Sequence, residues 1–278
     1  MKHTYYSQRK GTNPNQGGLT LADTTNLFLR RYLQMQDDGY FAQAFGFECV
    51  DEGHVHGEVR DVELEVLVTV RKSDLWPPDK MASQYDEDDL FDLVEFLYQH
   101  VSEPIDGTYH SWNNCGMHWH TFNRTSGQAK FRTMVNEILA LYAGPFELTE
   151  QGEVLQKPEA GFESIFAADI PSKDASVASR ISSAMLQFRR HASSLDDRRQ
   201  AVRDLADVLE YLRPKAKAVL SSADDSDLFN IANNFGIRHH NDKQKTTYDA
   251  ALWLSWMFYF YLATTHYLLR KIESGDAE

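Results

Sequence analysis

The sequence predicts an α+β protein that is predominantly α-helical, with a small mixed α/β N-terminal domain followed by a four-helix bundle. Two observations lead to this prediction. As far as residue 156, helical apolar periodicities are interspersed with short aromatic runs and glycine turns, whereas beyond residue 174 the apolar spacing is helical throughout. In addition, residues 250–269 carry no charged side chain and many aromatic ones, as is typical of the central helix of a bundle or of an oligomer interface.

Length and composition are those of a globular protein with two modest domains. The 278 residues are 42% hydrophobic and carry a formal net charge of -13. The charge is uneven, because residues 51–106 hold 16 acids and 4 bases, whereas residues 177–219 hold 9 bases and 5 acids. This distribution argues against a protein that coats nucleic acid nonspecifically, but it leaves room for one basic site.

The chain is predicted to divide into four parts. Residues 1–21 are polar and rich in Gly and Asn, which indicates a flexible arm. Residues 22–156 form the α+β domain, for which we expect a sensing or regulatory role, residues 157–174 a linker, and residues 175–278 the helical bundle. Two cysteines are too few for a disulfide framework and no signal peptide is expected, so a cytoplasmic location is predicted.

The first domain is predicted to start with a helix capped by Thr24 or Thr25. Residues 62–70 alternate apolar with polar side chains, which favours a strand, although acids at the start and Arg71 and Lys72 at the end suit a helix equally well. Four acids at residues 86–89 precede an amphipathic helix, where they suit the positive end of the helix dipole.

Two hairpins and a helix complete this domain. Residues 108–122 contain two aromatic runs around a turn, which predicts a hairpin. Residues 128–143 have the apolar spacing of a helix, and residues 146–157 predict a small hairpin with Gly152 in its turn.

The four bundle helices are predicted from apolar residues spaced three or four apart. In order, they carry Ile181, Met185 and Phe188; Val202, Leu205, Leu209 and Leu212, ended by Pro214; Leu228, Ile231, Ala232 and Phe235, capped by Gly236; and the long uncharged stretch from residue 250.

The long uncharged stretch has about the length that crosses a bilayer, but its polar side chains argue against a membrane anchor. Ser255, Tyr259 and His266 recur at helical spacing and form one polar stripe. We therefore predict a bundle core, with His266 as a hydrogen-bonded histidine of the core or interface.

The turn before the long helix has the residues that RNA cleavage requires. Arg238 offers planar donors to a phosphate, and His239 or His240 can accept and return a proton near neutral pH. Attack by a 2′-hydroxyl needs a base at that hydroxyl and positive charge on the scissile phosphate. The alternative is that Arg238 caps carbonyls at a helix end and that the histidines lie in water.

Several segments resemble a known family. YFAQAFGFECVDEG (residues 40–53), FDLVEFLYQHVSEP (91–104) and GQAKFRTMVNEILALY (127–142) running into FELTEQGEV (146–154) are similar to the N-terminal domain of AbiJ-type abortive-infection proteins. Helices with an Arg-and-His turn before the last one resemble the HEPN superfamily, whose members include RNase toxins. The resemblance implies a homodimer that brings two such turns together across a shared cleft.

The turn departs from the HEPN pattern at one point. That family places its histidine five to seven positions after the arginine, and here these positions hold Lys243, Gln244 and Lys245. Either His239 or His240 substitutes from a different geometry, or the domain has the fold without cleavage activity.

Further polar residues around the turn are candidates for RNA binding. They are Asn233, Asn234, Lys243, Gln244, Arg189 and Arg190. Ordinary helix-end residues and a solvated helix edge explain the asparagines and the arginines about as well.

The aromatic hairpin suggests a second site. His118 and His120 would point to one side of a strand with Cys115 in the adjoining turn, so three zinc-type ligands could converge. His110, or His54 and His56, would supply a fourth ligand. The spacing is not a standard zinc signature, and stray histidines in an aromatic hairpin are the alternative.

The leading functional hypothesis is metal-independent RNA cleavage or binding of the abortive-infection type, with no cofactor. Its expected partners are RNA, a second copy through the C-terminal helix, and an antitoxin or regulator at the acidic N-terminal domain, with no membrane. Two alternatives stay open: a non-catalytic HEPN-like binding or dimerisation module with a degenerate motif, and a metal-dependent enzyme with zinc at Cys115, His118 and His120.

Overall fold

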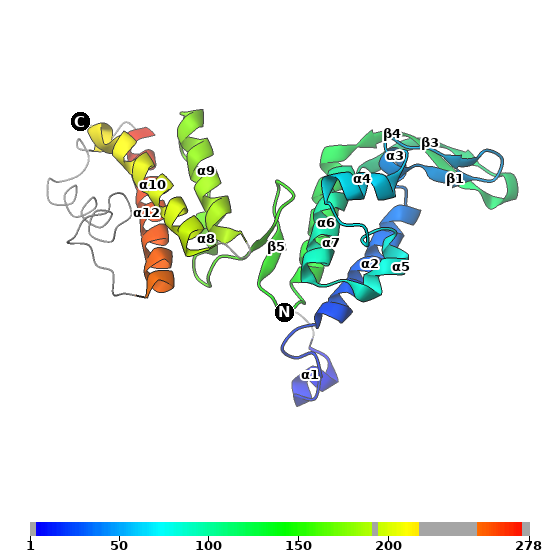
Figure 1. Ribbon diagram of the computed structural model, residues 1–278, viewed down its shortest axis with the longest axis horizontal. Helices are drawn as coiled ribbons and strands as arrows, with labels where there is room; N and C mark the ends of the chain where they lie inside the picture. Colours follow the sequence, from blue (N-terminus) through cyan, green and yellow to red (C-terminus); the bar gives the residue numbers. More distant parts are fainter. Residues whose placement is uncertain (1–3, 191–193, 217–248, 274–278) are drawn as a thin grey trace. The chain divides into compact units, whose positions relative to one another are not determined.

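The computed structural model describes residues 4–190, 194–216 and 249–273 and divides the chain into two compact units, Met1–Leu155 and Gln156–Glu278 (Figure 1). Each unit has a hydrophobic core of its own. The described elements are mostly helices, and the strands form small two-stranded sheets. The predicted α+β class with predominant α-helix is therefore confirmed.

The elements of the first unit begin with α1 (Tyr6–Lys10), α2 (Leu21–Asp37), α3 (Ala42–Phe45), β1 (Phe47–Cys49), β2 (Gly53–Val55), α4 (Val62–Thr69), α5 (Pro78–Met81) and η1 (Ala82–Gln84). They continue with α6 (Glu87–His100), β3 (Glu103–His110), η2 (Trp112–Asn114), β4 (Gly116–Asn123), α7 (Arg124–Leu139), β5 (Phe146–Leu148) and β6 (Val154–Gln156), the last strand ending at the boundary between the units. Both predicted hairpins are present, as β3–β4 and β5–β6.

Helix α6 is the centre of the first core. Its buried residues include Leu93 and Leu97, and they pack with Tyr32 of α2 and Phe131 of α7. Asp86 caps the helix by accepting from the backbone N–H of Asp89, and three acids occupy the first turn, as the sequence predicts.

Three boundaries differ from the predicted ones. Helix α2 begins one turn earlier than expected, because Thr20 rather than Thr24 or Thr25 accepts from the backbone N–H of Asp23. Helix α7 begins at Arg124, where Asn123 accepts from the N–H of Ser126. The predicted arm contains α1, and near its end the backbone of Leu19 bonds to Leu141 and Ala143.

The strand prediction for residues 62–70 is wrong, because this segment forms helix α4. Asp61 accepts a hydrogen bond from the N–H of Leu64 at 3.0 Å, and Glu63 and Glu65 lie in the positively polarised first turn. Val66 is buried, whereas the apolar side chains on the opposite face are exposed. The helix cap and the acids of the first turn therefore decide the conformation of this segment, despite the β-propensity of its valines.

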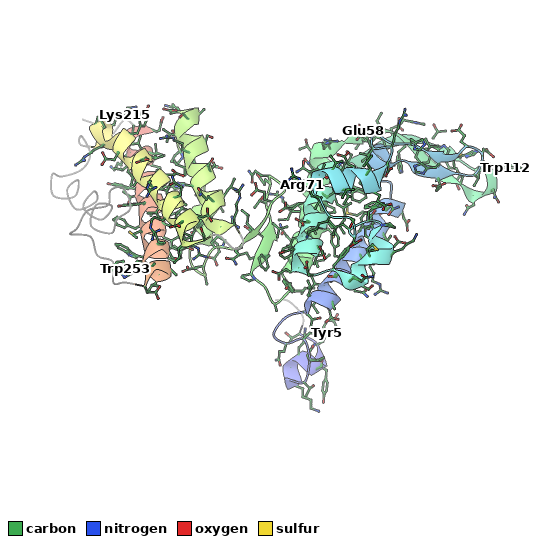
Figure 2. The ribbon with its side chains drawn as sticks, viewed as in Figure 1. Tyr5, Glu58, Arg71, Trp112, Lys215 and Trp253 are labelled. Carbon is green, nitrogen blue, oxygen red and sulfur yellow. The ribbon has the colours of Figure 1, made fainter. Side chains whose placement is uncertain are left out.

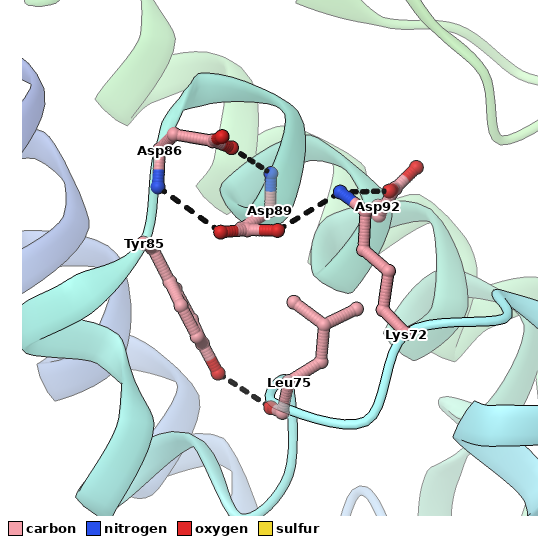
Figure 3. Close-up of polar contacts among 6 residues, drawn as sticks. All are labelled: Lys72, Leu75, Tyr85, Asp86, Asp89 and Asp92. Carbon is pink, nitrogen blue, oxygen red and sulfur yellow. Dashed lines mark hydrogen bonds and ion pairs between the residues drawn. The ribbon is translucent and has the colours of Figure 1, made fainter.

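Lys72 ties the loop after α4 to the start of α6 (Figure 3). Its Nζ atom lies 2.9 Å from Oδ1 of Asp89 and 2.8 Å from Oδ2 of Asp92. Nearby, the hydroxyl of Tyr85 donates to the carbonyl of Leu75, so both ends of the loop are held.

The second unit consists of helices in its described part: α8 (Glu163–Phe166), α9 (Ala175–Arg189), α10 (Leu195–Ala216) and α12 (Ala250–Glu273). Ile181, Leu205 and Phe258 are fully buried where α9, α10 and α12 pack together. The predicted linker contains α8, whose Ile165 and Phe166 pack against this core.

The long aromatic helix is confirmed as α12, and two expectations about the second unit are corrected. Helix α10 continues past Pro214 to Ala216, and the missing N–H of this proline removes only one helical hydrogen bond, to the carbonyl four residues earlier. His266 is buried, with 5% of its surface exposed, but neither ring nitrogen has a hydrogen-bond partner among the described residues. The predicted third bundle helix, around Leu228 to Gly236, lies outside the described residues.

Candidate metal centre

Two hairpins of the first unit form the candidate site. Strands β3 and β4 are antiparallel, with Thr108 opposite His118 and His110 opposite Gly116, and Trp112 stands near the tip (Figure 2). The turn between these strands uses left-handed backbone at Asn113, a conformation that asparagine tolerates. In the shorter β1–β2 hairpin, strand β1 ends at Cys49, opposite Gly53.

Four potential ligands meet where the two hairpins approach each other. Cys49, His110, Cys115 and His118 each offer one donor atom, and these atoms all lie within 4.8 Å of one another. Sγ of Cys115 is 3.3 Å from Nε2 of His118, and Sγ of Cys49 is 3.9 Å from Nδ1 of His110.

The Cys115–His118 and Cys49–His110 separations are close to those of tetrahedral zinc, whereas donor atoms up to 4.8 Å apart would have to move closer on binding. Bond lengths of about 2.3 Å to sulfur and about 2.0–2.1 Å to nitrogen give tetrahedral edges of about 3.4–3.8 Å between donor atoms. Two thiolates and two neutral imidazoles also cancel the charge of Zn²⁺, so a half-buried complex would carry little net charge.

Neighbouring side chains orient the two imidazoles. Nε2 of His110 lies 3.2 Å from Oδ2 of Asp51, which favours the tautomer whose free Nδ1 lone pair faces the centre. The His118 ring contacts the rings of Phe47 and His110, with centroid distances of 4.7 and 5.0 Å. Cys49 is buried, whereas the other three ligands are half-buried.

The structure brings together two of the three predicted ligands. Cys115 and His118 belong to the cluster, and His110, an alternative fourth ligand, joins them. His120 does not, because its Nε2 lies 3.0 Å from the hydroxyl of Thr108. The other alternative, His54 and His56, is not part of the cluster: His54 contacts Glu48 at 2.8 Å, and its ring packs against that of His56.

Cys49 is the ligand that sequence reasoning missed. It lies 61 residues before His110, and no local spacing connects the two. A usable signal is that the chain has only two cysteines, so a site with two thiolates has to use both.

The predicted RNA site lies mostly outside the described residues. This applies to Asn233, Asn234, Arg238, His239, His240, Lys243 and Gln244. Arg189 is described, and its Nε donates to the carbonyl of Gln156 at 2.9 Å while the guanidinium stacks on Phe166. Arg190 is the C-cap of α9.

Comparison with known proteins finds no matching family model, no similar curated protein and no similar solved structure. The AbiJ and HEPN resemblance therefore rests on the sequence patterns alone. None of the helices within the described ranges combines the length and hydropathy that crossing a bilayer requires.

Proposed function

We propose that this chain is a zinc-binding protein whose first unit holds one Zn²⁺ through Cys49, His110, Cys115 and His118. The observation that carries the proposal is the convergence of four donor atoms within 4.8 Å from separate segments: β1, the end of β3, the β3–β4 turn and β4. Such a metal would link two short hairpins, neither of which is stable alone in water.

The role of the metal is structural in this proposal. Four protein ligands complete a tetrahedron, whereas a catalytic zinc keeps one position open for water or substrate. The metal-dependent enzyme at Cys115, His118 and His120 is therefore the less favoured form of the site, because His120 is hydrogen-bonded elsewhere and Cys49 takes the remaining position.

Elemental analysis of the purified protein tests the site. We expect one zinc per chain, and Co²⁺ substitution should give the absorption bands of a tetrahedral site with thiolate ligands. Cys49→Ser and His110→Gln should each abolish stoichiometric binding. His120→Gln is the matched control and should keep one zinc. Wild-type protein that takes up no zinc, or a Cys49→Ser variant with full zinc content, would refute the proposal.

RNA cleavage is a second candidate, located in the second unit. It is supported by the Arg238, His239 and His240 turn and by the confirmed helix α12 that follows it. We propose a cytoplasmic HEPN-like domain that acts as a homodimer through α12, where Leu252, Trp256 and Tyr267 are exposed. In the non-catalytic form of this proposal, the same turn binds RNA without cleaving it.

Structured RNA incubated with the protein in EDTA tests this second candidate. Cleavage should persist without metal, and Arg238→Ala should abolish it while the protein stays folded. Cys49→Ser should leave cleavage in place, because it removes only the proposed zinc site. Equal activity in Arg238→Ala would exclude the Arg238 turn, and RNA binding without cleavage would favour the non-catalytic module.

A further inference from the structure

Helix α4 has an apolar stripe that faces solvent. Leu64, Leu67 and Val68 are spaced i, i+3 and i+4, and their exposed fractions are 55%, 47% and 65%. They lie on the face opposite Val66, which is buried in the core. An apolar stripe at this spacing normally packs against another element, so the exposed stripe marks an interaction surface.

An acidic groove runs beside this stripe. It has a volume of about 620 Å³ and lies between α4, α6 and the β5–β6 turn. Val70 and Phe96 contribute apolar surface to it, and four carboxylates line it: Glu65, Asp92, Glu95 and Glu153. Glu65 and Val68 are i, i+3 neighbours on the surface of α4, so the groove borders the stripe.

Some of the four carboxylates that line the groove have partners within the protein. Lys72 pairs with Asp92 at 2.8 Å, and the N–H of Val154 donates to Glu95. No lysine or arginine is among the described residues that line the groove. The surrounding sequence adds to this potential, because residues 51–106 hold 16 acids and 4 bases.

We propose that this surface, the α4 stripe with the adjoining groove, binds a basic amphipathic helix of a partner protein. Apolar residues of the partner helix would cover Leu64, Leu67 and Val68, and a lysine or arginine side chain would enter the groove beside Glu65. The acidic potential repels nucleic acid and also repels the same surface of a second copy, whereas it attracts a basic segment. The surface includes none of the four proposed zinc ligands, so the proposal stands independently of the metal.

Fluorescence anisotropy with a labelled amphipathic leucine–lysine helix as the probe tests this surface in the full-length protein. We expect saturable binding that weakens with salt, and none of a leucine–glutamate peptide of the same pattern. Leu64→Gln combined with Val68→Gln should weaken binding at least about tenfold, because two aliphatic contacts are lost. Leu33→Gln combined with Ile105→Gln alters two other exposed apolar residues and should leave binding unchanged.

A charge reversal tests the groove separately. Glu65→Lys should weaken binding of the basic peptide and reduce its salt dependence, whereas Glu137→Lys, an equal change on the exposed side of α7, should have little effect. Equal binding to the Leu64/Val68 variant and the wild type would overturn the proposal. A wild-type dimer that becomes monomeric in that variant, measured by sedimentation velocity, would also overturn it, because a second copy would then occupy the surface.

Discussion

Nε2 of His110 lies 3.2 Å from the Asp51 carboxylate, on the side of the ring that faces away from Cys49. This contact joins the two hairpins: Asp51 lies in the turn between β1 and β2, and His110 is the last residue of β3. A carboxylate that accepts the outer N–H of a ligating histidine fixes its tautomer and makes the inner nitrogen a stronger ligand.

Asp51→Asn should therefore lower zinc affinity by about 10–100-fold without removing a ligand. Competition with a chromophoric chelator measures the change. Glu52→Gln, the adjacent exposed acid, is the control for the loss of one negative charge and should bind zinc nearly as tightly as the wild type. Equal affinities in all three proteins would show that Asp51 does not orient His110.

Gly46 sets the position of the β1–β2 hairpin. Its φ is +81°, and a Cβ atom there would lie 1.9 Å from the carbonyl oxygen of Val55 in β2. Gly46→Ala should therefore displace β2, destabilise the first unit by about 2 kcal/mol or more, and weaken zinc binding through Cys49.

Gly53→Ala is the matched control for Gly46→Ala. Gly53 has a similar φ of +70°, but a Cβ atom there meets nothing within 4 Å, so only backbone strain of about 1 kcal/mol is expected. Urea unfolding and zinc titration of both variants separate the steric effect from the strain. Equal destabilisation would contradict the close-approach explanation.

Local sequence signals predict the β3–β4 hairpin and two of its metal ligands, because two aromatic runs on either side of an Asn- and Gly-containing turn are typical of a hairpin. They do not predict Cys49, whose proximity to His110 is created by the packing of two hairpins far apart in the chain. The third predicted ligand, His120, lies on the expected strand but is hydrogen-bonded to Thr108 instead. Contacts between side chains that are distant or diagonal in the sheet thus limit what the sequence predicts about the site.

The error at α4 has a different origin. Its valines have high β-propensity, but that preference reflects packing on a sheet, and no strand pairs with this segment among the described residues. The helical signal was also present, in Asp61 and the following acids.

In the second unit, each helix can be predicted from its own apolar spacing, without contacts from elsewhere in the chain. Ile181, Leu205 and Phe258 lie on these apolar faces, and all three are buried, as expected for a helical core.

Lys72→Met should destabilise the first unit by about 1 kcal/mol, because it leaves Asp89 and Asp92 close together without their shared cation. Burial disfavours the Asp89 carboxylate, but hydrogen bonds from Lys72 and the Asp86 backbone outweigh it and hold the pKa of Asp89 below its usual 3.8. The stabilisation is therefore fully present above pH 3.8 and is lost as the pH falls through the lowered pKa.

Acid titration of unfolding stability checks this prediction for Lys72. The variant should lose less stability than the wild type as the pH falls below 3.8, since its Asp89 gains less from ionisation. Lys80→Met, which removes an exposed lysine on α5, controls for the change in net charge. An unchanged acid profile in Lys72→Met would contradict the role assigned to the ion pair.

His266 should make the second unit acid-sensitive in a higher pH range. Burial, together with the nearby positive charge of Arg270, lowers the pKa of His266 below its usual 6.5. The unfolded chain therefore binds a proton at a pH where the folded unit does not, and stability falls as the pH drops below 6.5, by at most about 1.4 kcal/mol per pH unit. The His266→Leu variant has no imidazole to protonate in the unfolded chain. Its free energy of unfolding, relative to that of the wild type, should therefore be higher at pH 5.5 than at pH 8. Urea unfolding at the two pH values measures the difference, and an equal effect at both would mean that the folded unit protonates His266 as readily as the unfolded chain does.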